Sequence, residues 1–143
     1  MCPVGYADGS YKHLVCHCLL VETDSDGLVL IDTGLGLDDV ARDTPIPLSS
    51  KYTLRPALNT RETAVRQVER LGYAREDVRH IILTHLDFDH AGGLADFPEA
   101  KVHLHTKEFE YTQTSRISLL KRRLPTHWQH GPDWQTYEPT DGR

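Results

Sequence analysis

The chemistry of this chain is concentrated in one stretch, Thr84-His85-Leu86-Asp87-Phe88-Asp89-His90-Ala91-Gly92-Gly93. The stretch includes the end of a compact apolar segment, residues 80–84, which we predict to be a buried strand. Imidazole and carboxylate groups then follow one another within a few residues, and together they suit zinc, iron or manganese. The two glycines allow the chain to turn and to approach other backbone closely. We therefore predict a metal site with the ligands His85, Asp87, Asp89 and His90.

A second polar group follows a strand upstream. The apolar runs 14–21 and 28–32 flank the turn Asp24-Ser25-Asp26-Gly27, which predicts a β-hairpin. Both runs are almost continuously apolar, which indicates that both faces of these strands are covered. Asp32-Thr33-Gly34 closes the second run. Asp32 is either a residue of the site or an ordinary turn residue at the strand end.

The remaining elements are read from apolar spacing and from residues that start or stop helices. Residues 60–72 have helical spacing, with a cap-like Asn59 before them and Gly72 as a stop. A short turn is expected over 74–79, a strand over 101–105 and a helix over 107–120. The segment 122–143 holds prolines and many polar groups, and we expect it to be an extended loop.

The two motifs, in this order, resemble those of the metallo-β-lactamase-fold hydrolases. The signature of that family is His-x-His-x-Asp-His after a core strand, and the stretch 84–93 matches it at all but one ligand position. Residues 30–34 match the family's earlier strand-plus-Asp motif. The resemblance covers about residues 14 to 110 and looks most like the branch that contains N-acyl-homoserine lactonases. It implies an α+β fold, the metallo-β-lactamase-like αβ/βα sandwich of two sheets with flanking helices.

The resemblance also implies roles for the site residues. His85 and Asp87 would hold one metal, and Asp89 and His90 would help to hold a second. Asp89 would also be the catalytic residue, because it would orient a hydroxide shared by two zinc ions. Asp32 would lie next to the metal ligands without binding the metal itself. The expected activity is metal-dependent hydrolysis of an ester-like bond, with lactones as the leading substrates.

The sequence departs from the family pattern at two points. Asp87 stands where the family usually has His, which adds negative charge and lets manganese or iron compete better with zinc, or leaves only one strong metal site. The family's later ligands have no match here, since His127 and His130 lack the Pro-Gly-His pattern and are expected on the surface or in a lid. We therefore expect residues 1–143 to form one incomplete domain, the N-terminal half of the sandwich, with an exposed apolar sheet face.

Other activities fit the same motifs. A thioesterase of the glyoxalase II kind and a phosphodiesterase share the fold, and the loops and the second half set specificity. A half-domain without turnover is a further alternative. It would bind one metal weakly or not at all, or it would act only with a complementary half or as a homodimer.

The composition of the chain argues against some classes of binding partner. The net charge of −5 disfavours a nucleic acid, because such binding depends on Lys and Arg that neutralise phosphates. No run approaches the roughly 18 apolar residues of a membrane-spanning helix, and the first residues do not resemble a secretory leader. We expect a cytoplasmic protein with a small-molecule substrate. Cys16 and Cys18 share one face of a strand and are read as buried thiols, and Arg123 belongs to a basic run read as a solvated helix end.

Overall fold

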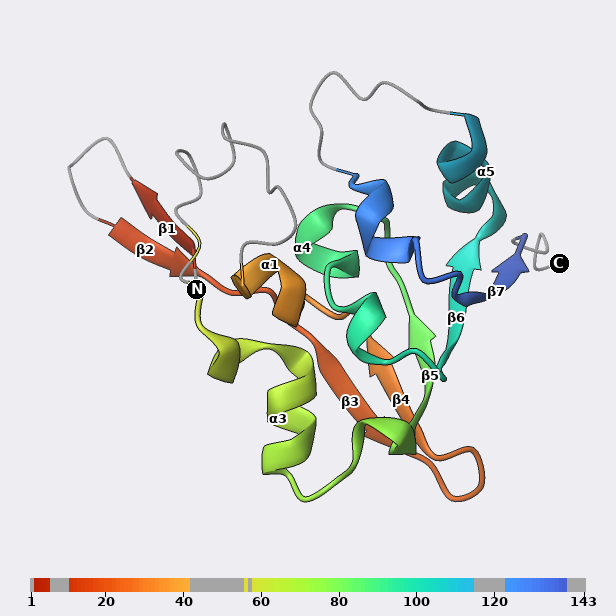
Figure 1. The fold of residues 1–143 in the computed structure, drawn as a ribbon, viewed down its shortest axis with the longest axis horizontal. Helices are drawn as coiled ribbons and strands as arrows, with labels where there is room; N and C mark the ends of the chain where they lie inside the picture. The colour runs from red at the N-terminus through yellow and green to blue at the C-terminus, as the bar shows by residue number, and fades with distance from the viewer. Residues whose placement is uncertain (1, 6–10, 42–55, 57, 115–122, 139–143) are drawn as a thin grey trace, which may run out of the picture.

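The computed structural model describes residues 2–5, 11–41, 56, 58–114 and 123–138. Five strands form one sheet in the order β3-β4-β5-β6-β7 (Figure 1). β3 and β4 are antiparallel, whereas β4, β5, β6 and β7 run parallel, so the sheet is mixed. The strands are β3 (Leu19–Glu22), β4 (Leu28–Ile31), β5 (Val78–Ile82), β6 (Lys101–His105) and β7 (Asp133–Tyr137).

Four α-helices and four 3₁₀ turns connect the strands in the described residues. Each βα connection returns the chain to the same edge of the sheet, so the loops after β4 and β5 lie side by side. A separate two-stranded hairpin is formed by β1 (Cys2–Gly5) and β2 (Tyr11–Leu14). The helices and turns are α1 (Leu37–Ala41), η1 (Thr60–Glu62), α3 (Ala64–Arg70), η2 (Arg75–Asp77), α4 (Phe88–Ala91), η3 (Leu94–Asp96), α5 (Thr106–Thr114) and η4 (Pro125–Trp128).

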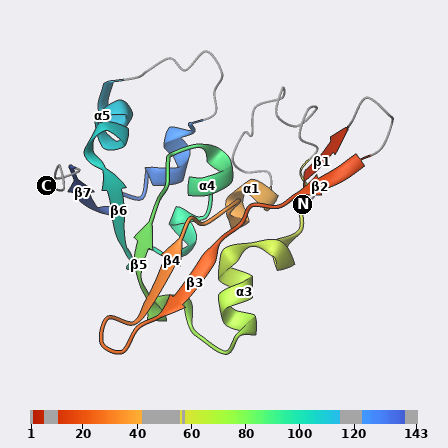
Figure 2. The ribbon, with the colours of Figure 1, turned by 180° about the vertical axis from the view of Figure 1, so that it is seen from behind.

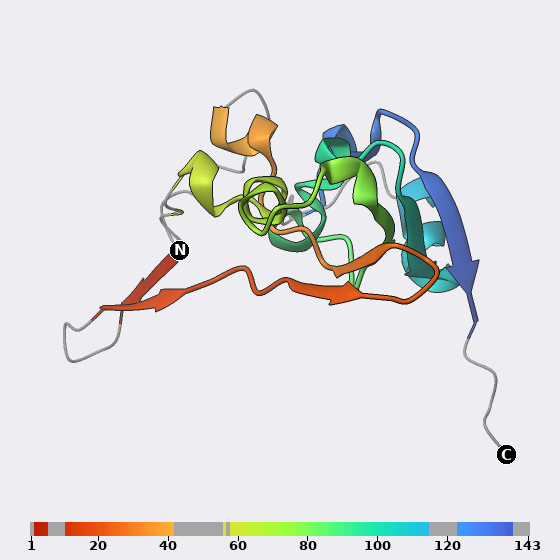
Figure 3. The same cartoon turned by 90° about the horizontal axis from the view of Figure 1, so that it is seen from below.

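The core lies between the helices and one face of the sheet. Leu28 and Leu30 from β4, Ile81 from β5 and Val102 from β6 are almost wholly buried there, and α3 contributes its own apolar residues to the same cluster. The view from below shows the helices gathered on this one side of β3 and β4 (Figure 3). Burial of this face is the main favourable contribution to folding.

The opposite face of the sheet is open over β3 to β5. Leu19, Val21 and Ile82 are 47 %, 44 % and 43 % exposed, and the strand register places them on one face with Ile31. The view from behind shows β3 and β4 without a covering helix (Figure 2). The expectation that both faces of the hairpin strands are covered is therefore wrong for the described residues, because the described helices pack against one face of β3 and β4 only.

Most expected elements are confirmed, with shifted ends. The hairpin of β3 and β4, the helical segment 60–70 and the strand 101–105 are present. Asn59 caps η1 through Arg61 N–H rather than the helix itself, which begins at Ala64. Gly72 follows the helix with a positive φ of 95°, as a helix stop requires. The helix expected over 107–120 is α5, and residues 115–122 lie outside the described residues.

The segment after residue 122 differs from the expected extended loop. It contains η4 and then β7, which pairs in parallel with β6 over its whole length. β7 is mostly polar, so its own pattern gave no strand signal. It becomes a strand because the edge of β6 offers backbone groups to pair with, and because Trp134 packs against Phe109 of α5, with ring centroids 5.6 Å apart.

None of the described helices is long and apolar enough to cross a membrane.

A row of polar rings crosses the other half of the open face. His80 Nδ1 lies 2.8 Å from His103 Nε2, and His103 Nδ1 lies 2.9 Å from the Tyr137 hydroxyl. Burial, with smaller contributions from His80 and Lys101, lowers the pKa of His103 from its ordinary 6.5, although Asp133 acts in the opposite direction. The folded protein therefore favours the neutral imidazole of His103.

We predict that this row makes stability depend on pH. The unfolded chain binds a proton at His103 near pH 6.5, before the folded chain does, so stability is lost as the pH falls through 6.5 toward the lower folded pKa. Urea unfolding between pH 7.5 and 5 should show a smaller loss for His103→Asn than for the unsubstituted protein. Equal losses in both proteins would contradict the prediction.

Candidate metal centre

Asp32 is the residue on which the site is built. It follows β4 directly, and its φ of 56° places it in the left-handed region that Asp tolerates better than most residues. Its carboxylate is buried and accepts hydrogen bonds from Thr84 N–H at 2.9 Å and from Thr84 Oγ1 at 2.8 Å. Its Oδ2 also lies 2.9 Å from His90 Nδ1. The end of β4 is thereby joined to the loop after β5 and to α4.

The four residues predicted as metal ligands lie around this carboxylate. The ring centroids of His85 and His90 are 3.9 Å apart. His85 Nε2 lies 3.5 Å from Asp87 Oδ2, and His90 Nε2 lies 3.6 Å from Asp89 Oδ2. Asp87 is the N-cap residue of α4, so Asp89 and His90 sit in the first turn of that helix. The structure thus brings Asp32 and the four sequence-predicted ligands together.

The chemistry of these donors fits a divalent metal, although the set is not closed. Two imidazoles and two carboxylates suit zinc, manganese or iron. Asp89 Oδ1 is buried and has no hydrogen-bond partner among the described residues, which is costly for a carboxylate unless a cation binds it. Within the same residues, no three His, Cys, Asp or Glu side chains converge on one point, as they do in a formed metal site. Binding therefore requires side-chain rotation and ligands in addition to these.

Hydrogen bonding at Asp32 gives His90 a defined orientation. With Nδ1 directed at the carboxylate, Nε2 is the nitrogen left to face Asp89. Carboxylates that hold a ligating histidine in this way fix its tautomer and raise its basicity. Thr84 was part of the quoted motif but had no predicted role. The structure shows that it connects Asp32 to His85, whose Nδ1 is 3.0 Å from Thr84 Oγ1.

Arg123 also reaches the site, which the sequence analysis did not predict. Its Nε lies 3.8 Å from Asp87 Oδ1, and its Nη2 donates a 2.8 Å hydrogen bond to Glu108 Oε1 of α5. Its side chain is 22 % exposed, so the reading of Arg123 as part of a solvated helix end is wrong. The guanidinium offsets the negative charge that Asp87 adds to the site. No local signal marks this contact, because residues 87 and 123 are distant in sequence.

His127 of η4 and His130 of the turn that follows differ in how deeply they are buried. His130 is exposed, as expected. His127 is 3 % exposed, so the expectation of a surface or lid histidine is wrong for it. Its Nε2 lies 2.8 Å from Asp39 Oδ1 of α1. A buried carboxylate partner explains why this imidazole is inside the protein.

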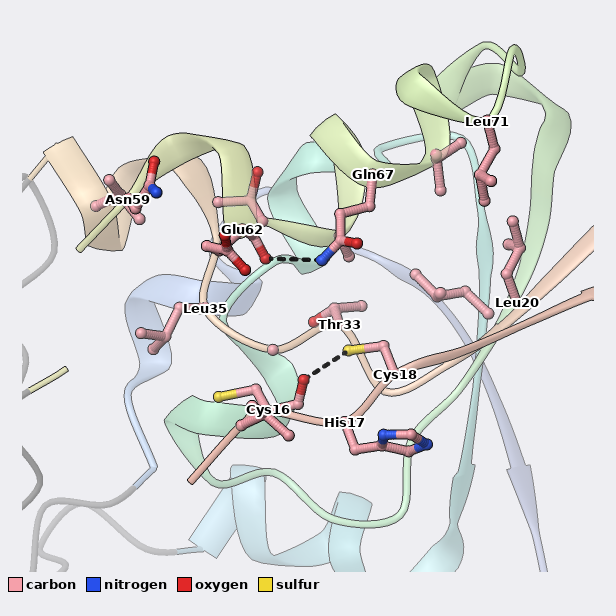
Figure 4. Close-up of a pocket in the computed structure, with 17 residues that line it drawn as sticks. Cys16, His17, Cys18, Leu20, Thr33, Leu35, Asn59, Glu62, Gln67 and Leu71 are labelled. Carbon is pink, nitrogen blue, oxygen red and sulfur yellow. Dashed lines mark hydrogen bonds between the residues drawn. The ribbon is translucent and has the colours of Figure 1, made fainter. Parts of the chain in front are cut away.

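A cavity of about 440 Å³ lies between the strand that leads into β3 and the helices η1 and α3. Figure 4 shows Cys16, Cys18 and Thr33 on one side, and Glu62 and Gln67 on the other. None of the predicted site residues lines it, so it is separate from the candidate metal centre. Burial raises the pKa of the Cys18 thiol to about 12, which keeps it protonated and agrees with a packing role for this cysteine.

The sequence pattern of the metallo-beta-lactamase superfamily matches residues 11–108, and the chain belongs to that superfamily. A probable metallo-hydrolase of Mycobacterium tuberculosis is 50 % identical over 129 residues, which are 88 % of this chain and 40 % of that protein. An N-acyl homoserine lactonase of Bacillus cereus is 31 % identical over 118 residues, which are 82 % of this chain and 47 % of that enzyme. The chain thus spans less than half the length of these relatives.

Solved structures show the same fold. The crystal structure of a quorum-quenching N-acyl homoserine lactone lactonase matches with a TM-score of 0.62 and 25 % identity, and the match covers 85 % of this chain and 43 % of that one. An N-acyl homoserine lactone hydrolase with the product N-hexanoyl-L-homoserine at its catalytic metal centre matches with a TM-score of 0.69 and 22 % identity over 99 % of this chain and 59 % of that one. The expected metallo-β-lactamase fold is confirmed.

We predict that Asp32→Asn weakens metal binding without loss of the fold. Asn tolerates the left-handed backbone, but its amide nitrogen cannot accept the hydrogen bonds that the carboxylate accepts. Zinc affinity, measured by chelator competition on the protein from its complete reading frame, should fall about 10- to 100-fold. Asp26→Asn in the exposed β3–β4 turn is the matched control and should leave the affinity unchanged. Unaltered affinity in Asp32→Asn with an intact thermal transition would contradict the role of Asp32.

Proposed function

We propose that this protein is a metal-dependent hydrolase of ester-like bonds and that its preferred substrate is a lactone. The observation that carries the proposal is the joining of Asp32, at the end of β4, to His90 in the motif after β5. This arrangement gathers the carboxylates and imidazoles of both motifs at one edge of the sheet. Membership of the metallo-beta-lactamase superfamily, whose relatives here include metallo-hydrolases, supports the same class of activity.

His85, Asp87, Asp89 and His90 would hold the metal, with two zinc ions as the leading assignment. A bound metal would supply a hydroxide nucleophile near neutral pH and would polarise the substrate carbonyl. The residues of this chain hold the metal-binding side chains in a defined orientation. Asp32 directs Nε2 of His90 toward Asp89, and Asp89 keeps one buried oxygen without a hydrogen bond. Asp89 is the residue we assign to orient the nucleophile.

The carboxylate at position 87 bears on the choice of metal. Asp87 brings a third negative charge into a site that already has Asp32 and Asp89, and hard oxygen donors shift preference toward manganese or iron. Arg123 lies close enough to offset part of that charge. We therefore expect manganese and iron to compete with zinc here more effectively than at a site with a histidine in this position.

Lactones are favoured by the kind of relatives that the chain matches. The Bacillus cereus relative is an N-acyl homoserine lactonase, and solved structures of the same fold are lactonases too. A thioester or a phosphodiester would meet the same site through the same carbonyl or phosphoryl oxygen. Direct comparison of the three substrate classes separates these activities.

The decisive test is a paired substitution in the motif. Asp89→Ala with His90→Ala, in the protein from the complete reading frame, should lower bound metal and reduce N-hexanoyl-homoserine lactone hydrolysis by more than about a hundredfold, since even partners of metal ligands commonly contribute ten- to a hundredfold. Asp24→Ala with His130→Ala removes the same residue types from exposed positions and should change neither quantity.

Two results would overturn the proposal. One is retention of both metal and activity in the Asp89 and His90 variant. The other is an unsubstituted protein that stays metal-free after reconstitution with zinc, manganese and iron. Faster turnover of a thioester or phosphodiester than of the lactone would keep the hydrolase and replace its substrate.

A further inference from the structure

Asp39 and His127 form a buried polar pair that the proposed chemistry does not use. Asp39 is 1 % exposed and His127 is 3 % exposed, and Oδ1 of the first lies 2.8 Å from Nε2 of the second. The two residues are 88 positions apart and belong to α1 and η4. A carboxylate buried this completely is costly unless it is paired and fully hydrogen-bonded. Replacing such a pair by apolar residues is often neutral for stability, so its presence calls for a role beyond packing.

The second oxygen of Asp39 connects this pair to the metal motif. Oδ2 accepts the Gly36 N–H at 3.0 Å, and it also lies against Gly92, where a Cβ would clash with it. Gly36 in turn lies so close to the Gly92 carbonyl that a Cβ there would clash as well. Figures 1 and 2 show α4 between α1 and the blue segment that contains η4. The carboxylate therefore forms one wall of the Gly92–Gly93 turn.

The turn is fixed on its other side by the loop after β4. Thr33 N–H donates to the His90 carbonyl at 2.8 Å. Gly93 N–H lies 3.1 Å from the Gly34 carbonyl and 3.0 Å from Thr33 Oγ1. These bonds hold the backbone immediately before and after Gly92. With Asp39 packed against Gly92 itself, the main chain that follows His90 is contacted from both sides.

We propose that the Asp39–His127 pair positions the Gly92–Gly93 turn, and through it the imidazole of His90, for metal binding. The inference rests on the proposed function, since it concerns the geometry of that metal centre. Asp39 and His127 are positioning residues. They touch neither of the predicted ligand side chains of α4, and they act through the backbone of the turn that α4 ends in. The pair also accounts for the burial of His127, which is the buried residue of η4.

The test compares metal binding with stability in the protein from its complete reading frame. Asp39→Asn replaces one carboxylate oxygen by an NH₂ group. That group lies either at Gly36 N–H and Gly92 or at Nε2 of His127, depending on the orientation of the amide. Zinc affinity by chelator competition should fall about tenfold or more, and the visible absorption bands of the cobalt(II)-substituted protein should change. Asp38→Asn makes the same chemical change on the exposed face of α1 and should leave the affinity and the cobalt spectrum unaltered.

A double variant separates positioning from simple stabilisation. Asp39→Ala with His127→Phe removes both buried polar side chains at nearly constant total volume but leaves the Gly36 N–H without its acceptor, so the protein should still unfold in one cooperative thermal transition, at a somewhat lower temperature. Zinc affinity should still fall about tenfold, because the wall against Gly92 is gone. If the fold and the affinity both recover in this variant, the pair is only structural and the inference is overturned. It is equally overturned if folded Asp39→Asn keeps the original affinity and cobalt spectrum.

Failure of the inference is distinguishable from failure of the proposed function. An unsubstituted protein that binds metal and hydrolyses the lactone, with Asp39 variants that bind metal equally well, refutes only the positioning role. An unsubstituted protein that binds no zinc, manganese or iron overturns the proposed function, and this inference with it.

Discussion

The candidate metal centre depends on one buried carboxylate, that of Asp32. It accepts hydrogen bonds from the backbone and the hydroxyl of Thr84, and it meets the imidazole of His90. These partners come from the end of β5 and from α4, and Thr33 and Gly34 after β4 are also hydrogen-bonded to α4 and to the turn that follows it. Because an unpaired buried carboxylate is costly, Asp32 holds the loops after β4 and β5 together, and the backbone bonds of Thr33 and Gly34 to the same region add to this. The left-handed backbone at Asp32 is the conformation that aims its side chain there.

The other carboxylates near Asp32 also have polar or charged partners. Asp87 has Arg123 beside it, and Arg123 is also bonded to Glu108. Asp39 is paired with His127, and this is the most completely buried contact between a carboxylate and an imidazole among the described residues. Asp96 is buried with the Leu37 N–H as its partner, and burial raises the pKa of Asp96 to about 6. The residues that contact the motif therefore come from α1, α5 and the segment around η4, as well as from the strand ends.

The described helices cover only one face of the sheet. One face of the sheet carries the core, whereas Leu19, Val21 and Ile82 remain nearly half exposed on the other. An apolar area of this kind is the sort of surface that proteins bury against another layer. The metal motif lies at the edge of this open face, and the described donors do not converge on one point. Both features agree with a chain that spans less than half the length of its curated relatives.

Short windows of the sequence were enough to predict the elements and the motif whose information is local. The β3–β4 hairpin, the helix after Asn59, the strand 101–105 and the cluster from His85 to His90 follow from apolar spacing, turn residues and donor types within short windows. Three other features became visible only in the folded chain: Arg123 meets Asp87, His127 is buried on Asp39, and polar residues 133–137 form a fifth strand. Each of these features depends on a partner far along the chain; Asp39 and His127, for example, are 88 positions apart. A contact over such a distance leaves no periodic pattern in the sequence from which it could be predicted.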